Sequence, residues 1–462
     1  MTAIGRAVYF QTPHVESIPL IDCLALVILP LMMNLSAVPQ IPMQRTIVLL
    51  FFGVLLFKNV VGYPACSRRF ARAANDAFAE VFSRDNRALW ILISLLLLFT
   101  LADARGGFLE LNPVLAFFSA FLRFFLLLFY LLSVVALNRS DRARRALIIA
   151  VVCGTGLFVA VNIGAYFAGM RGALEDVGQN KMLSLVGIST ARASLPIAAG
   201  VNNFGAMAGL AVVAGFSLAR HSRFIGCVVA VLGLSGVVLA DSRASLVVAV
   251  VTCVAIIFIR RLVPFLRWLP IAVVVMPVLL YGANAAIKNT SAQTLIARDG
   301  FGQQLGPLTG RDLVWKSAID VLAEPHPIHL IGYGASGQIT SGATKGYSWI
   351  FAEPAWRSRH SLHNTALQIA IDIGYIGFAL WLLLWWRFMA SVVARWRDGG
   401  SAETSVLTSM AIFIAVGGVM EVSGTPSYPD VFTVLMLLVV WTLPRLGPDR
   451  QVFPTTSQRT GN

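Results

Sequence analysis

The sequence predicts an all-α protein, a polytopic membrane bundle of about 12 transmembrane helices with one large outer loop that contains short helices. Three observations lead to this prediction. Of the 462 residues, 57% are hydrophobic and 13% are charged, and the mean hydropathy is +0.76. A soluble domain carries about 25% charged residues and could not bury this much apolar surface. Long apolar runs recur along the chain, and basic residues cluster in the short segments between them.

A helix that crosses a bilayer needs about 20 mostly apolar residues. Twelve segments approach this length, near 17–38, 45–61, 88–103, 112–137, 146–168, 194–218, 224–240, 244–259, 263–284, 364–386, 404–420 and 430–444. The first is longer than the apolar core of a signal peptide, and no small-residue cleavage site follows it. We therefore expect it to be retained as a helix.

The basic residues orient these spans, because cytoplasmic loops are enriched in Lys and Arg. If the N-terminus is cytoplasmic, the inside segments hold 21 Lys and Arg, whereas the short outer loops hold 6. Both termini are then predicted inside. The chain divides into helices one to nine (1–284), the outer loop (285–363), helices ten to twelve (364–444) and a cytoplasmic tail (445–462).

Several classes of function are disfavoured by the sequence. The net charge of +14 follows the membrane topology, so no nucleic-acid partner is expected. No CxxC pattern indicates a metal, and no DxD motif indicates a metal-dependent enzyme that uses nucleotide sugars. The run Gly332-Tyr333-Gly334-Ala335-Ser336-Gly337 fits GxGxxG, but no strand precedes it, so we reject a dinucleotide site. No Walker-type loop is present, which argues against ATP-driven transport.

The outer loop contains one predicted helix. Residues 311–323 place apolar side chains on one face at helical spacing, namely Leu313, Val314, Trp315, Ala318, Ile319 and Leu322. Pro325 and Pro327 end this pattern, because proline cannot continue a helix. We expect the helix to lie along the membrane surface or to pack on the bundle.

Basic residues that face outward depart from the charge pattern, and three arginines among them are candidates for a site. Arg192 precedes the sixth span, Arg243 lies in a tight hairpin, and Arg311 begins the outer-loop helix. If the bundle gathers them, their guanidinium groups would suit the oxygens of a pyrophosphate at the level of the lipid headgroups. The alternative is that each arginine pairs locally, with Asp241 and Asp312 as the obvious partners, or reaches toward headgroups.

Two histidines stand where the tenth helix is expected to begin. His360 and His363 are three residues apart and could share a helix face. An imidazole that titrates near neutral pH is a natural general base for an alcohol. The alternative is an interfacial histidine that only hydrogen-bonds a backbone carbonyl. Two histidines without a third ligand make a poor metal site.

Charged side chains fall within several predicted spans, among them Asp22, Arg123 and Asp372. A charge inside the bilayer costs about 2.5–3.5 kcal/mol on insertion scales, so such residues are usually paired or functional. We expect pairing, although the sequence does not identify the partners.

Four segments resemble the superfamily of bacterial O-antigen ligases and O-antigen polymerases, which are integral-membrane glycosyltransferases. The resemblance rests on Arg192 followed by Gly200-Val201-Asn202-Asn203-Phe204-Gly205, on Asp241-Ser242-Arg243-Ala244-Ser245, on Thr309-Gly310-Arg311 with Trp315 and Ile331-Gly332-Tyr333-Gly334, and on His363-Asn364 with Leu367-Gln368 and Gly374-Tyr375-Ile376-Gly377. These motifs cover about residues 190–380 in the family's order. Ala244 departs from the pattern, because glycine is common there in the family.

The resemblance implies transfer of a glycan from undecaprenyl pyrophosphate on the periplasmic face of the bacterial inner membrane. Carried over by position, Arg192, Arg243 and Arg311 would bind the pyrophosphate and stabilise it as the leaving group. His363 would take the proton from the acceptor hydroxyl, and direct displacement would invert the anomeric carbon. No metal or other cofactor would be required. Further candidates for binding substrate or orienting donor or base are Asn203, Trp315, His360 and Gln368.

Three functions remain open at this point. A ligase that moves O-antigen onto lipid A–core is favoured by the single large outer loop. A polymerase of O-antigen or exopolysaccharide would use the same donor with a growing glycan as acceptor. A flippase or exporter would also fit about twelve spans in contact with membrane lipids, but we find none of the inverted repeats expected of such a transporter.

Overall fold

The computed structural model describes residues 19–34, 44–61, 79, 81–83, 86–107, 113–138, 140–172, 179–193, 195–198, 200–287, 310–348, 361–427 and 429–442. Helices dominate these residues, and the only pairing of β type among them is an isolated bridge between Gln179 and Ala191. The predicted all-α class is thus confirmed. His360 and the predicted cytoplasmic tail lie outside the described residues.

Each of the twelve predicted segments contains a helix. In chain order these are α1 (Leu20–Asn34), α2 (Gln44–Val61), α4 (Arg87–Gly107), α5 (Pro113–Leu137), α6 (Asp141–Phe167), α8 (Val201–Ala219), α9 (Arg223–Leu239), α10 (Arg243–Ile257), α12 (Leu269–Ile287), α17 (Thr365–Arg397), α18 (Ala402–Gly417) and α19 (Pro429–Thr442). Within the described residues, α4, α6, α8 and α17 are long and apolar enough to cross a membrane. The helices on either side of Phe258 form a fifth candidate span that bends by 88°, and the remaining apolar helices are shorter. These features indicate a membrane protein, and the count of twelve spans stays a prediction.

Local side-chain chemistry sets several helix starts. Ser140 accepts a hydrogen bond from the Ala143 N–H and thereby begins α6 five residues before the predicted start. Gly200, with φ of 123°, delays the start of α8 to Val201, whereas the sixth span was predicted from residue 194. The preceding turn is held instead by Asn162, whose Oδ1 accepts the Ile197 N–H at 2.9 Å.

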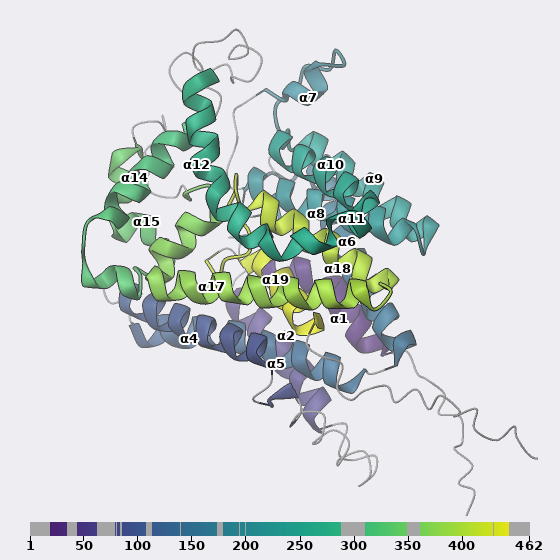
Figure 1. Ribbon diagram of the computed structural model, residues 1–462. Helices are drawn as coiled ribbons and strands as arrows, with labels where there is room; N and C mark the ends of the chain where they lie inside the picture. The colour runs from purple at the N-terminus through teal and green to yellow at the C-terminus, as the bar shows by residue number, and fades with distance from the viewer. Residues whose placement is uncertain are drawn as a thin grey trace, which may run out of the picture.

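The long helix α17 crosses the centre of the bundle, with α4 and α5 on one side and α8 to α10 and α12 on the other (Figure 1). The α8–α9 pair packs closely because small residues line its interface. A Cβ atom at Gly215 would lie 2.6 Å from the Ala230 nitrogen, and one at Gly226 would collide with the Ala219 backbone. Small residues at such a seam let apolar helices approach each other in lipid. The chain between α10 and α12 forms α11 (Ile259–Leu262) and the 3-10 helix η2 (Val263–Trp268).

The described part of the outer loop folds into a compact segment with its own apolar core. It comprises α14 (Arg311–Ala323), η3 (Pro327–Leu330), α15 (Gly337–Thr340) and η4 (Ala343–Gly346), which lie at one end of α17 (Figure 1). Its core consists of Val314, Trp315, Ala318, Ala343, Tyr347, Leu362 and Ile371. The predicted helix over 311–323 is confirmed, and its packing face is narrower than the predicted stripe, because Ile319 is exposed.

The tenth predicted span, 364–386, differs from a single continuous helix. Gly374 adopts φ of 72° and ψ of −173°, which breaks α17 into a short helix over 365–373 and a longer one that continues to Arg397. The break frees the carbonyls of Ile371 and Asp372, which accept the N–H groups of Tyr333 (2.9 Å) and Gly334 (2.8 Å). The backbone of the Gly-Tyr-Gly sequence at 332–334 therefore caps the C-terminal end of the short helix. Only glycine fits at position 374, where the helix breaks.

Asp22, Arg123 and Asp372 each contact another group within the described residues. The Asp22 carboxylate accepts the Lys58 Nζ at 2.9 Å and the Tyr130 hydroxyl at 3.3 Å. Asp372 accepts hydrogen bonds from Gly337 and Gln368. Arg123 lies over the Phe124 ring, 4.5 Å from its centroid.

Candidate active site

Two predicted site residues meet on a carboxylate that the sequence analysis did not single out. Arg311 is the first residue of α14, His363 lies two residues before α17, and Glu421 lies in the connection between α18 and α19. The Arg311 Nη2 donates to Glu421 Oε1, and His363 Nδ1 lies 2.8 Å from Glu421 Oε2. These three side chains, 15–17% exposed, form what we call the site cluster.

The charges of the site cluster fix the state of the carboxylate. Burial alone would raise the pKa of Glu421, but the adjacent His363 imidazole and Arg311 guanidinium lower it to about 2. Glu421 is therefore ionised and can only accept hydrogen bonds. It follows that His363 Nδ1 carries the proton in this contact, and that Nε2 is the nitrogen with a lone pair in the neutral ring.

His363 is held in a strained backbone conformation. Its φ of 48° lies in the left-handed region, which costs a residue other than glycine about 1–3 kcal/mol. Both backbone polar groups of the preceding residue, Leu362, are hydrogen-bonded. Its N–H donates to Gln368 Oε1 (3.1 Å), and its carbonyl accepts the Trp315 indole N–H (3.1 Å). Two predicted substrate-binding residues thus contact the backbone beside His363.

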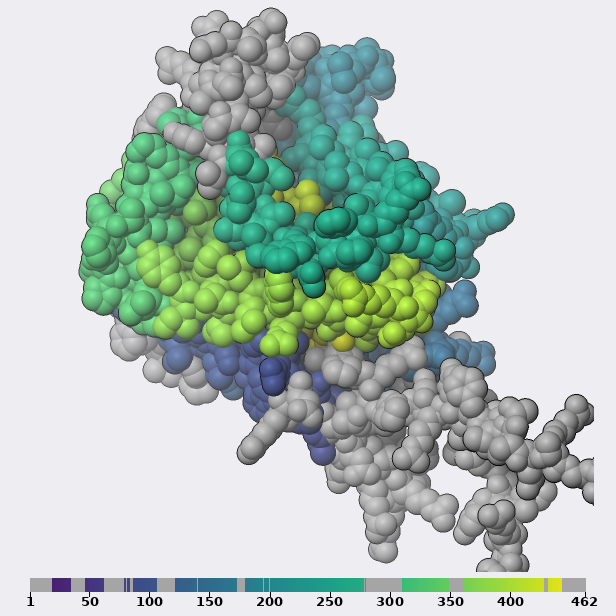
Figure 2. Space-filling view, in the orientation of Figure 1, coloured from purple at the N-terminus to yellow at the C-terminus, as the bar shows by residue number. Residues whose placement is uncertain are grey.

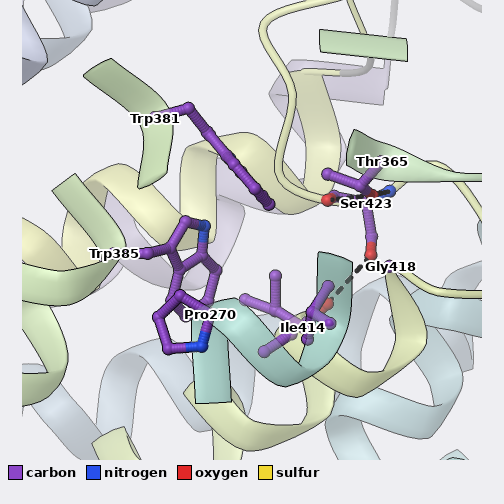
Figure 3. Close-up of a pocket in the computed structure, with 9 residues that line it drawn as sticks. Pro270, Thr365, Trp381, Trp385, Ile414, Gly418 and Ser423 are labelled. Carbon is purple, nitrogen blue, oxygen red and sulfur yellow. Dashed lines mark hydrogen bonds between the residues drawn. The ribbon is translucent and has the colours of Figure 1, made fainter. Parts of the chain in front are cut away.

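The connection that carries Glu421 is tied to the start of α17. Asn364 caps the helix at the Leu367 N–H and donates from Nδ2 to the Val419 carbonyl at 3.0 Å. The Thr365 hydroxyl donates to the Ser423 carbonyl (2.7 Å) and accepts the Ser423 N–H (2.8 Å), as Figure 3 shows. These bonds fix the connection that carries Glu421 to the start of α17, directly beside His363.

A small pocket adjoins this unit between α12, α17 and α18. Thr365 and Ser423 lie at one edge, and Trp381, Trp385, Pro270 and Ile414 are among the other residues that line it (Figure 3). No charged residue lines the pocket among the described residues. We therefore regard it as part of the apolar support of the site rather than as the reacting centre.

The other two predicted arginines lie around the hairpin between α9 and α10. The Arg192 side chain is buried, and its Nε donates to the Ala240 carbonyl at 3.1 Å. Arg243, the first residue of α10, is half-buried and forms no hydrogen bond or ion pair within the described residues. Asp241, which was its predicted local partner, instead accepts the Met182 N–H at 3.2 Å. Likewise the observed partner of Arg311 is Glu421, 110 residues away, rather than the neighbouring Asp312.

The hairpin lies against the start of α8 and near the connection that carries Glu421. Gly205 packs directly on Ser242, which places Asn203 on the helix turn beside the hairpin. At the end of α18, Gly417 lies beside both Val248 of α10 and Ser423. The space-filling view shows a hollow between α12 and the α8–α10 group, with yellow atoms of the C-terminal part at its floor (Figure 2).

Residues 228–382 match a family model described as O-antigen ligase. The resemblance inferred from the sequence is thus confirmed over this third of the chain, and it supports a function of O-antigen ligase or polymerase type. No curated protein matches the chain. The matched O-antigen ligase segment contains Arg243, Arg311, Trp315, His363 and Gln368, whereas Arg192, Asn203 and Glu421 lie outside it.

Sequence reasoning missed Glu421, although one signal could have found it. Glu421 is the only charged residue in the predicted outer loop 421–429, directly after an apolar span. An acidic residue there lies on the same side of the membrane as the outward arginines, and its own loop contains no basic residue that could pair with it. No local carboxylate motif marks Glu421, because its partners are distant in the chain.

Proposed function

We propose that this protein is a glycosyltransferase that transfers an undecaprenyl-pyrophosphate-linked polysaccharide, the O-antigen, to lipid A–core on the periplasmic face of the inner membrane. The observation that carries the proposal is the site cluster within and beside the matched O-antigen ligase segment. It combines a histidine in a defined tautomer with the Arg311 guanidinium, and transfer from a lipid diphosphate requires a base and a cationic group.

In the proposed reaction His363 is the general base. With Nδ1 donating to Glu421, the Nε2 lone pair takes the proton from the acceptor hydroxyl. The acceptor oxygen attacks the anomeric carbon, and the bond from that carbon to the diphosphate oxygen breaks. The diphosphate leaves with the bonding electrons, and the configuration of the anomeric carbon inverts. Because the ionised Glu421 remains beside the ring, it stabilises the imidazolium that forms.

The arginines bind the diphosphate and stabilise it as it leaves. Arg243 is the strongest candidate for direct contact, because no described residue neutralises its charge. Arg192 lies at the same hairpin and adds positive potential. Glu421 balances part of the charge of Arg311 and also contacts His363. Arg311 therefore connects the diphosphate site to the base through this carboxylate. A diphosphate held by guanidinium groups is a good leaving group without help from a metal or nucleotide.

A polymerase that joins the same donor to a growing glycan is the alternative, because the matched family supports both activities. Both reactions use the same donor chemistry and therefore the same site cluster. They differ in the acceptor, whose binding surface determines whether lipid A–core or another glycan receives the chain.

The test is complementation of a deletion strain with the wild-type chain, His363→Ala or Arg243→Ala. Lys316→Ala is the matched control, because Lys316 is an exposed cation on the same helix as Arg311. Loss of ligase activity would leave bare lipid A–core and long polymer on its carrier, whereas loss of polymerase activity would leave core capped by one repeat. Normal surface polysaccharide in both site variants would contradict the catalytic assignment, and blocked glycan movement with intact transfer would indicate a transporter.

A further inference from the structure

A buried polar network lies directly behind His363. Its centre is Gln368, which is 0% exposed on the short helix 365–373. Gln368 Oε1 accepts the Leu362 N–H at 3.1 Å, and its Nε2 donates to Gln338 Oε1 at 2.8 Å and to Asp372 Oδ1 at 2.9 Å. Both amide hydrogens and the amide oxygen therefore have protein partners, which leaves no donor for a substrate.

Asp372 extends this network to two further parts of the chain. It is 1% exposed, and its Oδ1 also accepts the Gly337 N–H at 2.8 Å from the start of α15. Its Oδ2 accepts the Ser427 hydroxyl from the connection between α18 and α19. One carboxylate thus joins the outer-loop segment, the short helix and the connection that carries Glu421.

We propose that Gln368 and Asp372 are positioning residues that orient the His363 imidazole toward the acceptor hydroxyl. This inference rests on the proposed function, in which His363 is the base. Neither side chain contacts the substrate, and both act through the Leu362 backbone. The strained residue is the histidine itself, and its own backbone N–H makes a long hydrogen bond of 3.4 Å to Ser361 Oγ, whereas Leu362 beside it is bonded at both its N–H and its carbonyl.

Loss of the Gln368 hydrogen bonds would release the backbone beside His363. Without Gln368 the Leu362 N–H loses its partner, and the bond from Trp315 alone fixes only the carbonyl of that residue. The backbone of His363 can then relax from φ of 48° toward an ordinary value. Such a rotation carries the imidazole away from Glu421 and from the acceptor, whereas the arginines of the α9–α10 hairpin stay in place.

The test uses the full chain in lipid nanodiscs with Gln368→Met, which keeps the length and bulk of the side chain but removes its hydrogen bonds. The matched control is Asn59→Leu, because Asn59 is also a buried amide but bonds Ser133 within another part of the bundle. We expect Gln368→Met to lower kcat for glycan transfer by about 100-fold with an unchanged donor KM. Amide hydrogen exchange over residues 361–364 should become faster in this variant but not in Asn59→Leu.

A second pair of variants separates positioning from general damage. Asp372→Leu should lose kcat, and Asp372→Asn should restore most of it, because the amide oxygen still accepts from Gly337 and Gln368. Wild-type kcat in Gln368→Met, a change confined to donor KM, or equal loss in Asn59→Leu would overturn the positioning role. If the wild-type chain transfers no glycan, the proposed function fails instead, and the exchange measurement still reports on the network.

Discussion

Two carboxylates, Asp22 and Glu421, are each paired with a cation within the bundle, but their surroundings differ. Asp22 joins Lys58 and Tyr130 across three helices, none of these residues has a positive φ, and the Lys58 side chain remains 35% exposed. Glu421 joins Arg311 and His363, whose side chains are 17% exposed, and His363 is held at φ of 48°. All three members of the site cluster lie at helix ends or in connections.

Under the proposed function, Asp22 and Lys58 form a structural pair, whereas Glu421 and its partners take part in the reaction. A carboxylate in a membrane span needs a partner, and the Lys58 ammonium, at the end of a flexible side chain, forms an ion pair with Asp22. The site cluster contains in addition an imidazole and a strained backbone that several hydrogen bonds maintain. Strain of this kind is retained where the geometry of a side chain matters for function.

The largest effect should come from His363→Ala. Removal of the proposed general base should lower kcat by about 1,000-fold, because general base catalysis typically contributes 10²–10⁴-fold. Donor binding should remain, since the arginines are intact. The measurement is the rate of glycan transfer from a lipid diphosphate donor at saturating concentration. Activity within a few-fold of wild type would remove the distinction between the two carboxylate pairs.

The comparison is tested directly by the parallel variants Glu421→Gln and Asp22→Asn. Glu421→Gln should lower kcat by about 100-fold, because the neutral amide no longer stabilises the imidazolium. Asp22→Asn should leave kcat unchanged and lower only the transition temperature, because the partly exposed Lys58 can still reach water. Equal loss of kcat in both variants would mean that the two pairs play the same role.

Arg243→Ala should weaken donor binding about tenfold, because hydrogen bonds to charged groups contribute about 1.5–3 kcal/mol. The change should appear in donor KM and in inhibition by inorganic pyrophosphate, with little change in the transition temperature, because Arg243 has no partner within the described residues. Arg260→Ala, at the other end of the α10 region, is the control. Unchanged inhibition by pyrophosphate would place the diphosphate elsewhere.

The smallest predicted effect is a pH dependence of stability. The pKa of Glu421 is lowered from 4.5 to about 2 in the folded chain, so its contribution is fully present above about pH 4.5 and is lost as the pH falls toward 2. Glu421→Gln should lack this part of the acid destabilisation, whereas Asp320→Asn, which changes an exposed acid, should retain it. Transition temperatures between pH 6 and 3 provide the measurement, and identical profiles for all three chains would contradict the ionised state of Glu421.

Much of the helical framework could be predicted from the sequence, because apolar length alone places each helix to within a few residues at most ends. The break at Gly374 could not, because it depends on the Tyr333 and Gly334 N–H groups that replace the lost helix bonds. Arg311 and His363 were found as unusual outward residues, whereas Glu421 was missed because pairing across 58 and 110 residues leaves no local pattern. The Lys58 partner of Asp22 was hidden for the same reason.

The central claim is that the site cluster performs the transfer. The most direct measurement quantifies released lipid diphosphate and glycosylated acceptor from the purified chain in nanodiscs that contain lipid-linked glycan and lipid A–core. The wild-type chain should yield equal amounts of the two products, and His363→Ala should yield neither. Equal product from both chains would contradict the claim.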